Sequence, residues 1–329
     1  MMKIHVLTLF TFLILTAGCG NTVTDQQNSG NRPDYVLVIH GGAGTISRDR
    51  LSAAQENEYH NKLNEALEAG ENILKNGGSS MEAVRAAIIV MEDSPLFNAG
   101  VGAVFTNQKM VELDASVMDG KTLNAGAIAG VTDIKNPILG AIAVMDDSPH
   151  VMLAGKGASE FAKERGLDIV DNSYFHTQRR LDAVTRQIEQ DKHGTVGAVA
   201  LDMEGNLAAG TSTGGMSNKK YGRIGDSPVI GAGNYANNNT CAVSATGHGE
   251  FFIRMVVAYD ISALMEYGNM SLKEASEKVI NEKLVEAGAT GGIVAVDNQG
   301  NISMPFNTSG MYRGFVKSTG ERETAIFKD

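Results

Sequence analysis

The order in which helical and strand-like patterns follow one another is the feature of this sequence that most constrains its fold. Residues 35–44 predict a buried strand that runs into a glycine loop at "HGGAG", and the apolar spacing within 51–77 and 79–95 predicts two helices. Short strands are expected between 104 and 146, the last of them "GAIAVMDD", and a strand hairpin, two helices and final strands follow residue 195. These blocks predict a layered α+β fold in which helices cover both outer faces of stacked sheets.

A charged segment interrupts these blocks. After a helical pattern at 155–166, the sequence from Asp171 is charged and has only a weak apolar stripe. We therefore expect a mobile linker over about 171–194, directly ahead of Thr195.

Composition limits the partners that this chain can have. Its 329 residues, 43% of them hydrophobic, can bury a full-sized core of one or two domains. The 38 Asp and Glu residues exceed the 28 Lys and Arg residues, which gives a formal net charge of −10 and no basic stripe. A nucleic-acid partner is therefore not expected.

The N-terminal stretch predicts export. One lysine precedes the apolar run 4–17, which is short for a spanning helix, and small residues then lead to Cys19, as in a bacterial lipoprotein signal. Thr16 stands where that pattern prefers leucine, so an ordinary cleaved signal with an incidental cysteine is the alternative. We expect 1–19 to be a signal peptide, Cys19 to be lipidated, and the protein to lie in the cell envelope, either anchored to a membrane through that lipid alone or periplasmic.

Two further features fit this location. Residues 20–34 are polar and rich in turn-forming residues, which predicts a flexible tether ahead of the folded domain. The second cysteine of the chain, Cys241, is expected to be a small buried residue, so no intramolecular disulfide is predicted if Cys19 is lipidated or removed.

One candidate nucleophile fails on its context. "HGGAG" at 40–44 is similar to the oxyanion loop of esterases, and "GTSTG" at 210–214 matches a nucleophile elbow around Ser212. An elbow requires a helix immediately afterwards, whereas a polar, glycine-rich loop follows Ser212. The only histidine after Ser212 is His248, too close to leave room for the intervening strands, so an esterase triad is not expected.

A second candidate lies in "HGTVGAVALD", where Thr195 precedes an apolar strand. If the bond from Gly194 to Thr195 were cut, Thr195 would carry a hydroxyl and an α-amine on adjacent carbons, and the amine titrates near neutrality. The threonine hydroxyl could make that cut itself by attacking the carbonyl of Gly194. On this stretch alone, a threonine that starts a strand after a turn glycine remains the alternative.

Five motifs together resemble one family. They are "HGGAG", "PLFNAGVGAVFT", "HGTVGAVALD", "TSTGGMSNKKYGRIGDSPVIGAGNYA" and "SATGHGEFFIR", in this order over residues 35–317. The combination is similar to the plant-type (type 2) L-asparaginase and isoaspartyl peptidase family of N-terminal-nucleophile hydrolases. The resemblance implies a four-layer αββα sandwich, self-cleavage into an α subunit (35–194) and a β subunit (195–329) of one catalytic domain, and an (αβ)₂ assembly.

The resemblance also implies the catalytic roles. Thr195 would be the autocleavage residue and nucleophile, Thr213 the neighbouring hydroxyl that tunes it, and Asn98 a residue that orients the site. Thr246 and the backbone amide of Gly247 would form the oxyanion hole.

Substrate recognition is implied in the same way. Arg223 would hold the α-carboxylate and Asp226 the α-ammonium of an aspartyl unit, with the backbones of Gly247 and Gly249 lining the site. The scissile bond would then lie at the aspartyl side chain, as in L-asparagine or a β-aspartyl dipeptide. His248 is expected at the rim without an assigned role, and His193 is expected to be a solvated linker residue.

The family further implies a structural Na⁺ held by backbone carbonyls and no catalytic metal. The aligned carbonyl donors are Met91, Glu92, Ser94, Phe97, Ala99 and Val101.

Two alternatives remain at this point. Glycosylasparaginases and threonine aspartases share the fold and typically carry Asp before the nucleophile, whereas this chain has Gly194, which favours the asparaginase branch. A binding protein that kept the fold and lost the chemistry would remain one intact chain.

Overall fold

The computed structural model describes residues 32–185 and 194–328. Pro33–Asp329 form one compact unit, and Met1–Arg32 form another, of which only the last residue is described. The predicted signal peptide, Cys19 and His193 lie outside the described residues. No helix in the described part of the chain combines the length and the apolar character needed to cross a membrane.

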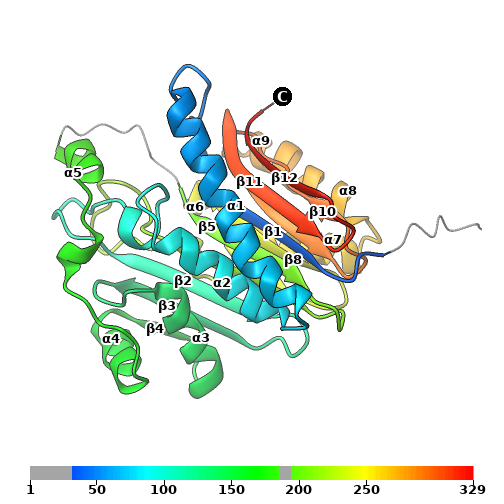
Figure 1. Cartoon of the computed structure of the whole chain (residues 1–329), viewed down its shortest axis with the longest axis horizontal. Coiled ribbons are helices and arrows are strands. Elements are labelled where there is room, and N and C mark those ends of the chain that lie inside the picture. The colour runs from blue at the N-terminus through cyan, green and yellow to red at the C-terminus, as the bar shows by residue number, and fades with distance from the viewer. Residues whose placement is uncertain (1–31, 186–193, 329) are drawn as a thin grey trace, which may run out of the picture. The chain divides into compact units, whose positions relative to one another are not determined.

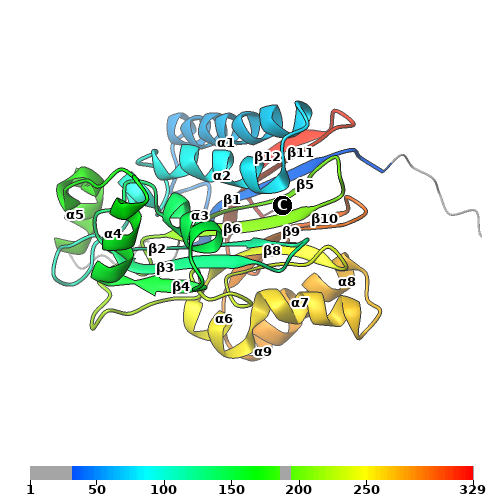
Figure 2. The ribbon, with the colours of Figure 1, turned by 90° about the horizontal axis from the view of Figure 1, so that it is seen from below.

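Two stacked sheets form the centre of the unit from Pro33, and helices cover their outer faces (Figure 1, Figure 2). Within the described residues the larger sheet has the order β12-β11-β1-β5-β6-β2-β3-β4 and the smaller one β10-β9-β8-β7. The predicted four-layer αββα sandwich of the N-terminal-nucleophile hydrolase type is therefore confirmed. The strands are β1 (Val36–Gly44), β2 (Leu113–Asp119), β3 (Ala125–Val131), β4 (Met152–Ala154), β5 (Val196–Leu201), β6 (Leu207–Thr213), β7 (Asn234–Ala236), β8 (Cys241–Gly247), β9 (Gly291–Asp297), β10 (Ile302–Ser303), β11 (Gly310–Lys317) and β12 (Arg322–Phe327).

The helices on the large sheet begin where the sequence predicts. Capping boxes at Ser52 and Ser79 start α1 (Ala53–Lys75) and α2 (Ser80–Glu92). Each serine side chain accepts a hydrogen bond from the backbone amide three residues later, and the side chain of that later residue accepts one from the backbone amide of the serine. Both helices lie over the same sheet in Figure 2. Their apolar stripes, which include Leu63 and Leu67, are fully buried there.

The helices on the small sheet form the opposite outer layer (Figure 2). They are α6 (Gly249–Met255), α7 (Val257–Glu266), α8 (Leu272–Glu277) and α9 (Leu284–Glu286), with a π-helical turn at Lys278–Lys283. The first two are separated by Val256, whose left-handed φ of 50° ends α6 and starts α7. Phe252, Ile261 and Leu284 are buried against β8 and β9.

The layer between the two sheets explains the continuous burial of the inner strands. Along β1, Leu37 and Ile39 face the helices, whereas Val36 and Val38 pack toward the small sheet. Antiparallel pairing sets β1 against β5, with His40 opposite Gly197. The start of β5 is thereby held between two strands of the large sheet.

Two segments differ from the sequence predictions. "GAIAVMDD" belongs to a helix, α3 (Pro137–Asp147), rather than to a strand, because Pro137 supplies a helical first turn and the apolar run is long enough for three turns against β2 and β3. "HGGAG" continues β1 through a bulge at Gly41 and pairs with β11, where a glycine loop was expected.

The expected mobile linker is also different over its described part. Residues 172–175 form a 3₁₀ turn and α5 (Gln178–Thr185) follows. Phe175 is fully buried, and the Asn172 side chain bonds to Val111 in both directions, at 2.8 and 3.1 Å. These contacts fix the segment, and the predicted helix before it is α4 (Gly155–Glu164). Residues 186–193 of the linker lie outside the described part.

Candidate active site

Thr195 lies at the start of an inner strand, where the sequence placed it. It directly precedes β5 and is 6% exposed. Gly194 and Thr195 are joined in one continuous chain in this structure, so it shows how their bond lies before any cleavage. The geometry around that bond therefore bears on its cleavage.

The hydroxyls of Thr195 and Thr213 form a chain that ends on the carbonyl of Gly194. Thr195 Oγ1 donates to Thr213 Oγ1 at 3.1 Å, and Thr213 Oγ1 donates to the Gly194 oxygen at 3.0 Å. The Gly215 amide donates to Thr213 Oγ1 at 3.0 Å as well. One donor and two acceptor positions of the Thr213 hydroxyl are thus all used, which fixes its orientation.

Asn98 supplies a second donor to the same carbonyl. Its Nδ2 lies 2.8 Å from the Gly194 oxygen and 2.7 Å from the Gly215 oxygen, while its Oδ1 accepts from the Val104 amide at 2.9 Å. The side chain is 4% exposed. Two oriented donors on one carbonyl stabilise the negative charge that develops there when a nucleophile attacks.

Gly42 allows the backbones to approach closely at this bond. Its φ is 107°, and a Cβ there would lie 3.0 Å from the Gly194 Cα and 3.1 Å from the Thr195 nitrogen. A larger residue would be strained and would press on the scissile bond. The "HGGAG" motif thus packs β1 against Gly194 and Thr195.

A small cavity beside Thr195 contains the predicted recognition residues. It has about 250 Å³ of empty space, and its described lining includes Thr195, Thr213, Arg223, Asp226 and Gly247. Gly249 closes one side, because a Cβ on it would fall 2.7 Å from Arg223 Nη2 and 2.9 Å from Asp226 Oδ1. The structure therefore brings together the nucleophile and both groups expected to bind the aspartyl unit.

Asp226 is buried beside a cation and has a spare acceptor. It is 5% exposed, and its Oδ2 has no hydrogen-bond partner within the described residues. Burial raises the pKa of this carboxyl to about 7, and the nearby Arg223 acts in the opposite direction. An unsatisfied buried carboxylate oxygen is suited to an incoming ammonium group.

Arg223 is positioned by a residue that the sequence reasoning missed. Glu250 accepts from Arg223 Nε at 2.9 Å and from Nη2 at 3.0 Å, a side-on pair. The guanidinium lowers the pKa of Glu250 by this hydrogen bonding. Glu250 lies in the quoted "SATGHGEFFIR" motif, two residues after His248, which is expected at the rim. Nothing in the motif indicates that Glu250 pairs with Arg223.

The predicted oxyanion-hole residues occupy the end of β8. Thr246 is fully buried, and its Oγ1 accepts from the Ala43 amide at 3.2 Å. Gly247 lines the cavity with a φ of 154°, and a Cβ there would lie 2.6 Å from the Gly291 Cα. His248 follows at the start of α6, half-buried, with its ring 5.1 Å from that of Phe251.

Several buried polar residues that were not predicted from the sequence lie next to the site and support it. His40 Nε2 lies 3.0 Å from Ser244 Oγ, and Thr211 Oγ1 lies 2.7 Å from the same atom, which joins β1, β6 and β8. Complete burial lowers the pKa of His40 to about 3, so the imidazole is neutral. Lys219, in the loop after Gly215, is buried, and its Nζ lies 3.1 Å from the carbonyl oxygen of Glu112.

Ser212 is a structural residue, as its context predicted. It is fully buried in β6 and donates to Glu92 Oε1 at 2.6 Å. Burial raises the pKa of Glu92 to about 8, so this carboxyl is mostly protonated at neutral pH. The Ser212 side chain therefore points away from Thr195, toward the face of the large sheet that the helices cover.

The fold and the threonine at the start of an inner strand are those of the N-terminal-nucleophile hydrolases. A family model described as Asparaginase matches residues 33–326, and the chain belongs to this family.

Named relatives cover nearly the whole chain. "Isoaspartyl peptidase" of Escherichia coli strain K12 is 50% identical over 89% of this chain and 96% of that protein. "Putative isoaspartyl peptidase/L-asparaginase" of Dictyostelium discoideum is 49% identical over 85% of this chain and 93% of its own length. "Isoaspartyl peptidase/L-asparaginase" of Homo sapiens is 40% identical over 81% of this chain and 88% of its own length.

Proposed function

We propose that this protein is a self-processing threonine hydrolase that cleaves the side-chain amide of L-asparagine and of β-aspartyl dipeptides and releases L-aspartate. The observation that carries the proposal is the Gly194–Thr195 bond, whose carbonyl receives two hydrogen bonds while the Thr195 hydroxyl is bonded to one of the donors. The names of the relatives agree with this activity.

Self-cleavage uses the hydroxyl chain. Thr195 Oγ attacks the carbonyl carbon of Gly194, and its proton passes to Thr213, which already donates to the oxygen that becomes negative. The carbon–nitrogen bond then breaks as the proton taken up through Thr213 is delivered to the Thr195 nitrogen, which leaves an ester on Thr195 Oγ and a free α-amine. Water hydrolyses the ester, which yields the Gly194 carboxylate and restores the threonine hydroxyl.

Substrate hydrolysis then uses the new amine. The amine takes the proton of Thr195 Oγ as this oxygen attacks the side-chain carbonyl of the aspartyl unit, and it returns the proton to the leaving nitrogen. An aspartyl ester of Thr195 remains, and water releases L-aspartate from it. Gly247 and Thr246 are the donors proposed to stabilise the oxyanion.

Recognition of the α-groups selects the bond. The Arg223 guanidinium pairs with the α-carboxylate, and Asp226 accepts from the α-ammonium. With both α-groups occupied, only a side-chain amide can reach Thr195. Ordinary internal peptide bonds lack these two free groups at the aspartyl unit and are not substrates.

Release of ammonia from L-asparagine and of leucine from β-aspartyl-leucine tests the proposal. The processed wild type should hydrolyse both, and α-aspartyl-leucine should remain intact. Binding of L-aspartate without hydrolysis of either substrate would replace the enzyme with a binding protein.

We further propose a structural Na⁺ at 91–101. A Cβ on Gly100 would lie 2.2 Å from the backbone oxygen of Glu92, and one on Gly102 would lie 2.1 Å from the backbone oxygen of Phe97. Only glycine at these two positions lets the two carbonyl groups lie so close to the loop. Hard carbonyl oxygens suit Na⁺. A higher unfolding temperature in NaCl than in choline chloride at equal ionic strength would support the site, and equal temperatures would contradict it.

Assembly and location are proposed on the family resemblance and the N-terminal sequence. Processed chains pair as (αβ)₂, which light scattering on the purified protein tests. Cys19 carries a lipid that anchors the protein in the cell envelope. Recovery of the protein in the soluble cytoplasm with Cys19 unmodified would contradict the second proposal.

A further inference from the structure

A second cavity lies on the other side of Gly194 from the recognition residues. Its described lining includes Ile46, Tyr59, Phe97 and Tyr312. Among the described residues that line the two cavities, Gly194 alone belongs to both. The backbone of Gly194 therefore forms the wall between the aspartyl site and this second space.

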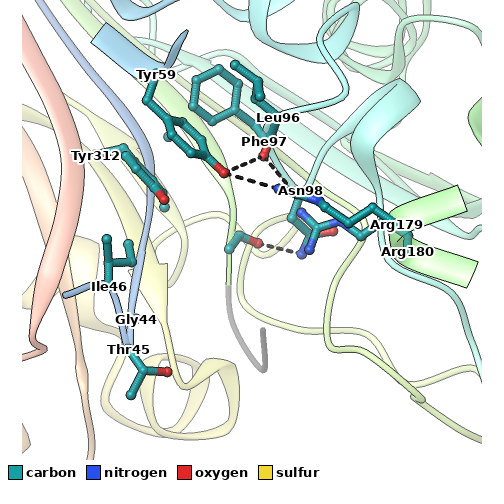
Figure 3. A pocket seen from close by; sticks show the side chains of 13 residues that line it. Gly44, Thr45, Ile46, Tyr59, Leu96, Phe97, Asn98, Arg179, Arg180 and Tyr312 are labelled. Carbon is teal, nitrogen blue, oxygen red and sulfur yellow. Dashed lines mark hydrogen bonds between the residues drawn. The ribbon is translucent and has the colours of Figure 1, made fainter. Parts of the chain in front are cut away.

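Tyr59, Phe97 and Tyr312 form an aromatic wall of the second cavity, and Arg179 reaches the hydroxyl end of Tyr59 (Figure 3). Tyr59 and Tyr312 stack with ring centroids 4.0 Å apart, and Phe97 meets the Tyr59 ring edge-on at 5.8 Å. Arg179 Nη2 bonds to the Leu96 carbonyl at 3.2 Å, and its Nη1 bonds to the Tyr59 hydroxyl at 3.5 Å.

Arg179 and Arg180 also line this cavity, and Arg180 Nε donates to the Gly102 carbonyl at 2.8 Å. The aromatic wall suits an apolar side chain.

The chemistry of Thr195 fixes the direction in which a leaving group departs. The α-amine that protonates the leaving nitrogen is the atom that was bonded to Gly194, so the leaving nitrogen must come within hydrogen-bond reach of that atom. The acyl part of the substrate lies toward Arg223 and Asp226. The remainder of a dipeptide must then extend into the space that Gly194 gives up on cleavage.

We propose that the leaving residue of a β-aspartyl dipeptide binds in the cavity lined by Tyr59, Phe97 and Tyr312, which processing connects to the aspartyl site. This inference rests on the proposed function and adds a specificity: dipeptides whose second residue is leucine or phenylalanine are better substrates than β-aspartyl-glycine. Ammonia from L-asparagine does not need the cavity.

The first test uses the wild type alone. Its kcat/KM should be about tenfold higher for β-aspartyl-leucine than for β-aspartyl-glycine, because the extra side chain is buried against the aromatic wall. Equal values for the two dipeptides, or a preference for the glycine compound, would overturn the inference.

The second test fills the cavity. Thr45 lines it and is exposed, so Thr45→Trp can be accommodated by the fold. With rates normalised to processed enzyme, the variant should lose at least about tenfold in kcat/KM for β-aspartyl-leucine and stay within about twofold for L-asparagine. The matched control is Thr319→Trp in the exposed turn between β11 and β12, which should change neither value.

The outcomes separate the two proposals. A wild type that hydrolyses both substrates, with Thr45→Trp affecting them equally or not at all, would overturn the leaving-residue site and keep the proposed function. A wild type that hydrolyses neither substrate would contradict both. Tyr312→Ala gives an independent check, since removal of one aromatic wall should bring the leucine and glycine dipeptides to within about threefold of each other.

Discussion

The outer layers and the inner layer of this protein are built from different chemistry. Between helices and sheets most buried residues are apolar, as with Leu63 and Leu67 on α1 and Ile261 on α7, and the Ser212–Glu92 pair is a polar exception. Between the two sheets, the apolar residues Val38 and Val199 share the layer with buried polar side chains, and Thr195 lies in this inner layer. The outer layers therefore stabilise the fold, and the inner layer contains the site.

The inner polar groups are tolerated because most of their polar atoms are paired. Asp226 Oδ2 and Asn234 Oδ1 are exceptions within the described residues. Ser244 contacts both His40 and Thr211, and Asn234 Nδ2 donates to Ser116 Oγ at 2.8 Å. Buried groups without such partners would destabilise the layer by roughly 1–3 kcal/mol each. The difference between layers predicts that outer substitutions change stability alone, whereas substitutions of the inner residues that contact Thr195 or its scissile carbonyl change chemistry.

The largest effect is expected from Thr213→Val. Removal of its hydroxyl takes one donor from the Gly194 carbonyl and the acceptor from Thr195, so self-cleavage should slow by about 10³-fold. The matched control is Thr211→Val on the same face of β6, which should lose stability but still process. Time courses on denaturing gels measure both rates, and equal slowing of the two variants would remove the distinction.

Leu67→Ala should have the next largest effect, on stability. Its side chain is fully buried between α1 and the large sheet, so truncation should lower the free energy of unfolding by about 3 kcal/mol. The value of kcat/KM for L-asparagine should stay within about twofold of wild type, because the inner layer is unchanged. Urea unfolding and a steady-state assay measure the two quantities. A loss of kcat/KM as large as the slowing of self-cleavage expected for Thr213→Val would contradict the distinction between the two layers.

Arg223→Lys should weaken substrate binding without affecting the fold. The lysine keeps the charge but loses the two-pronged geometry, which is worth about 2 kcal/mol, so KM for L-asparagine should rise by tens of times. A small change in kcat is expected. Substrate titrations test this, and an unchanged KM would show that Arg223 does not contact the α-carboxylate.

The smallest effect, about tenfold, is expected between pH 7 and pH 6. Burial raises the pKa of Asp226 to about 7, so this group becomes protonated and loses its attraction for ammonium as the pH falls below that value. The inhibition constant of L-aspartate should therefore rise about tenfold per unit below pH 7, and it should be flat above it. Asp226→Asn should bind weakly at every pH. A constant inhibition constant from pH 5 to 8 in the wild type would contradict the role of Asp226.

The sequence predicted the layers and the main residues of the site, and its failures have physical causes. The helices α1 and α2 were predicted because their apolar spacing is a local pattern that can be read directly from the sequence. "GAIAVMDD" was misassigned because a short apolar run fits a buried strand and a buried helix equally well. Thr195, Thr213, Arg223 and Asp226 were found through motifs and lie together.

The remaining site residues depend on contacts between distant segments. Glu250, on α6, holds Arg223 from 27 positions further along the chain, and His40 contacts Ser244 across 204 positions of sequence. Tyr59 and Tyr312 stack although they come from α1 and β11. Neither periodicity nor a local motif carries information on such pairs, so the second cavity became visible only in the structure.

The central claim is that Thr195 is freed by its own hydroxyl, and intact-mass analysis of the purified protein after incubation near neutral pH tests it most directly. The wild type should give two fragments that meet between Gly194 and Thr195, while Thr195→Ala, incubated beside it, should stay whole. A wild type that remains one chain, or a Thr195→Ala variant cleaved at the same bond, would contradict the account.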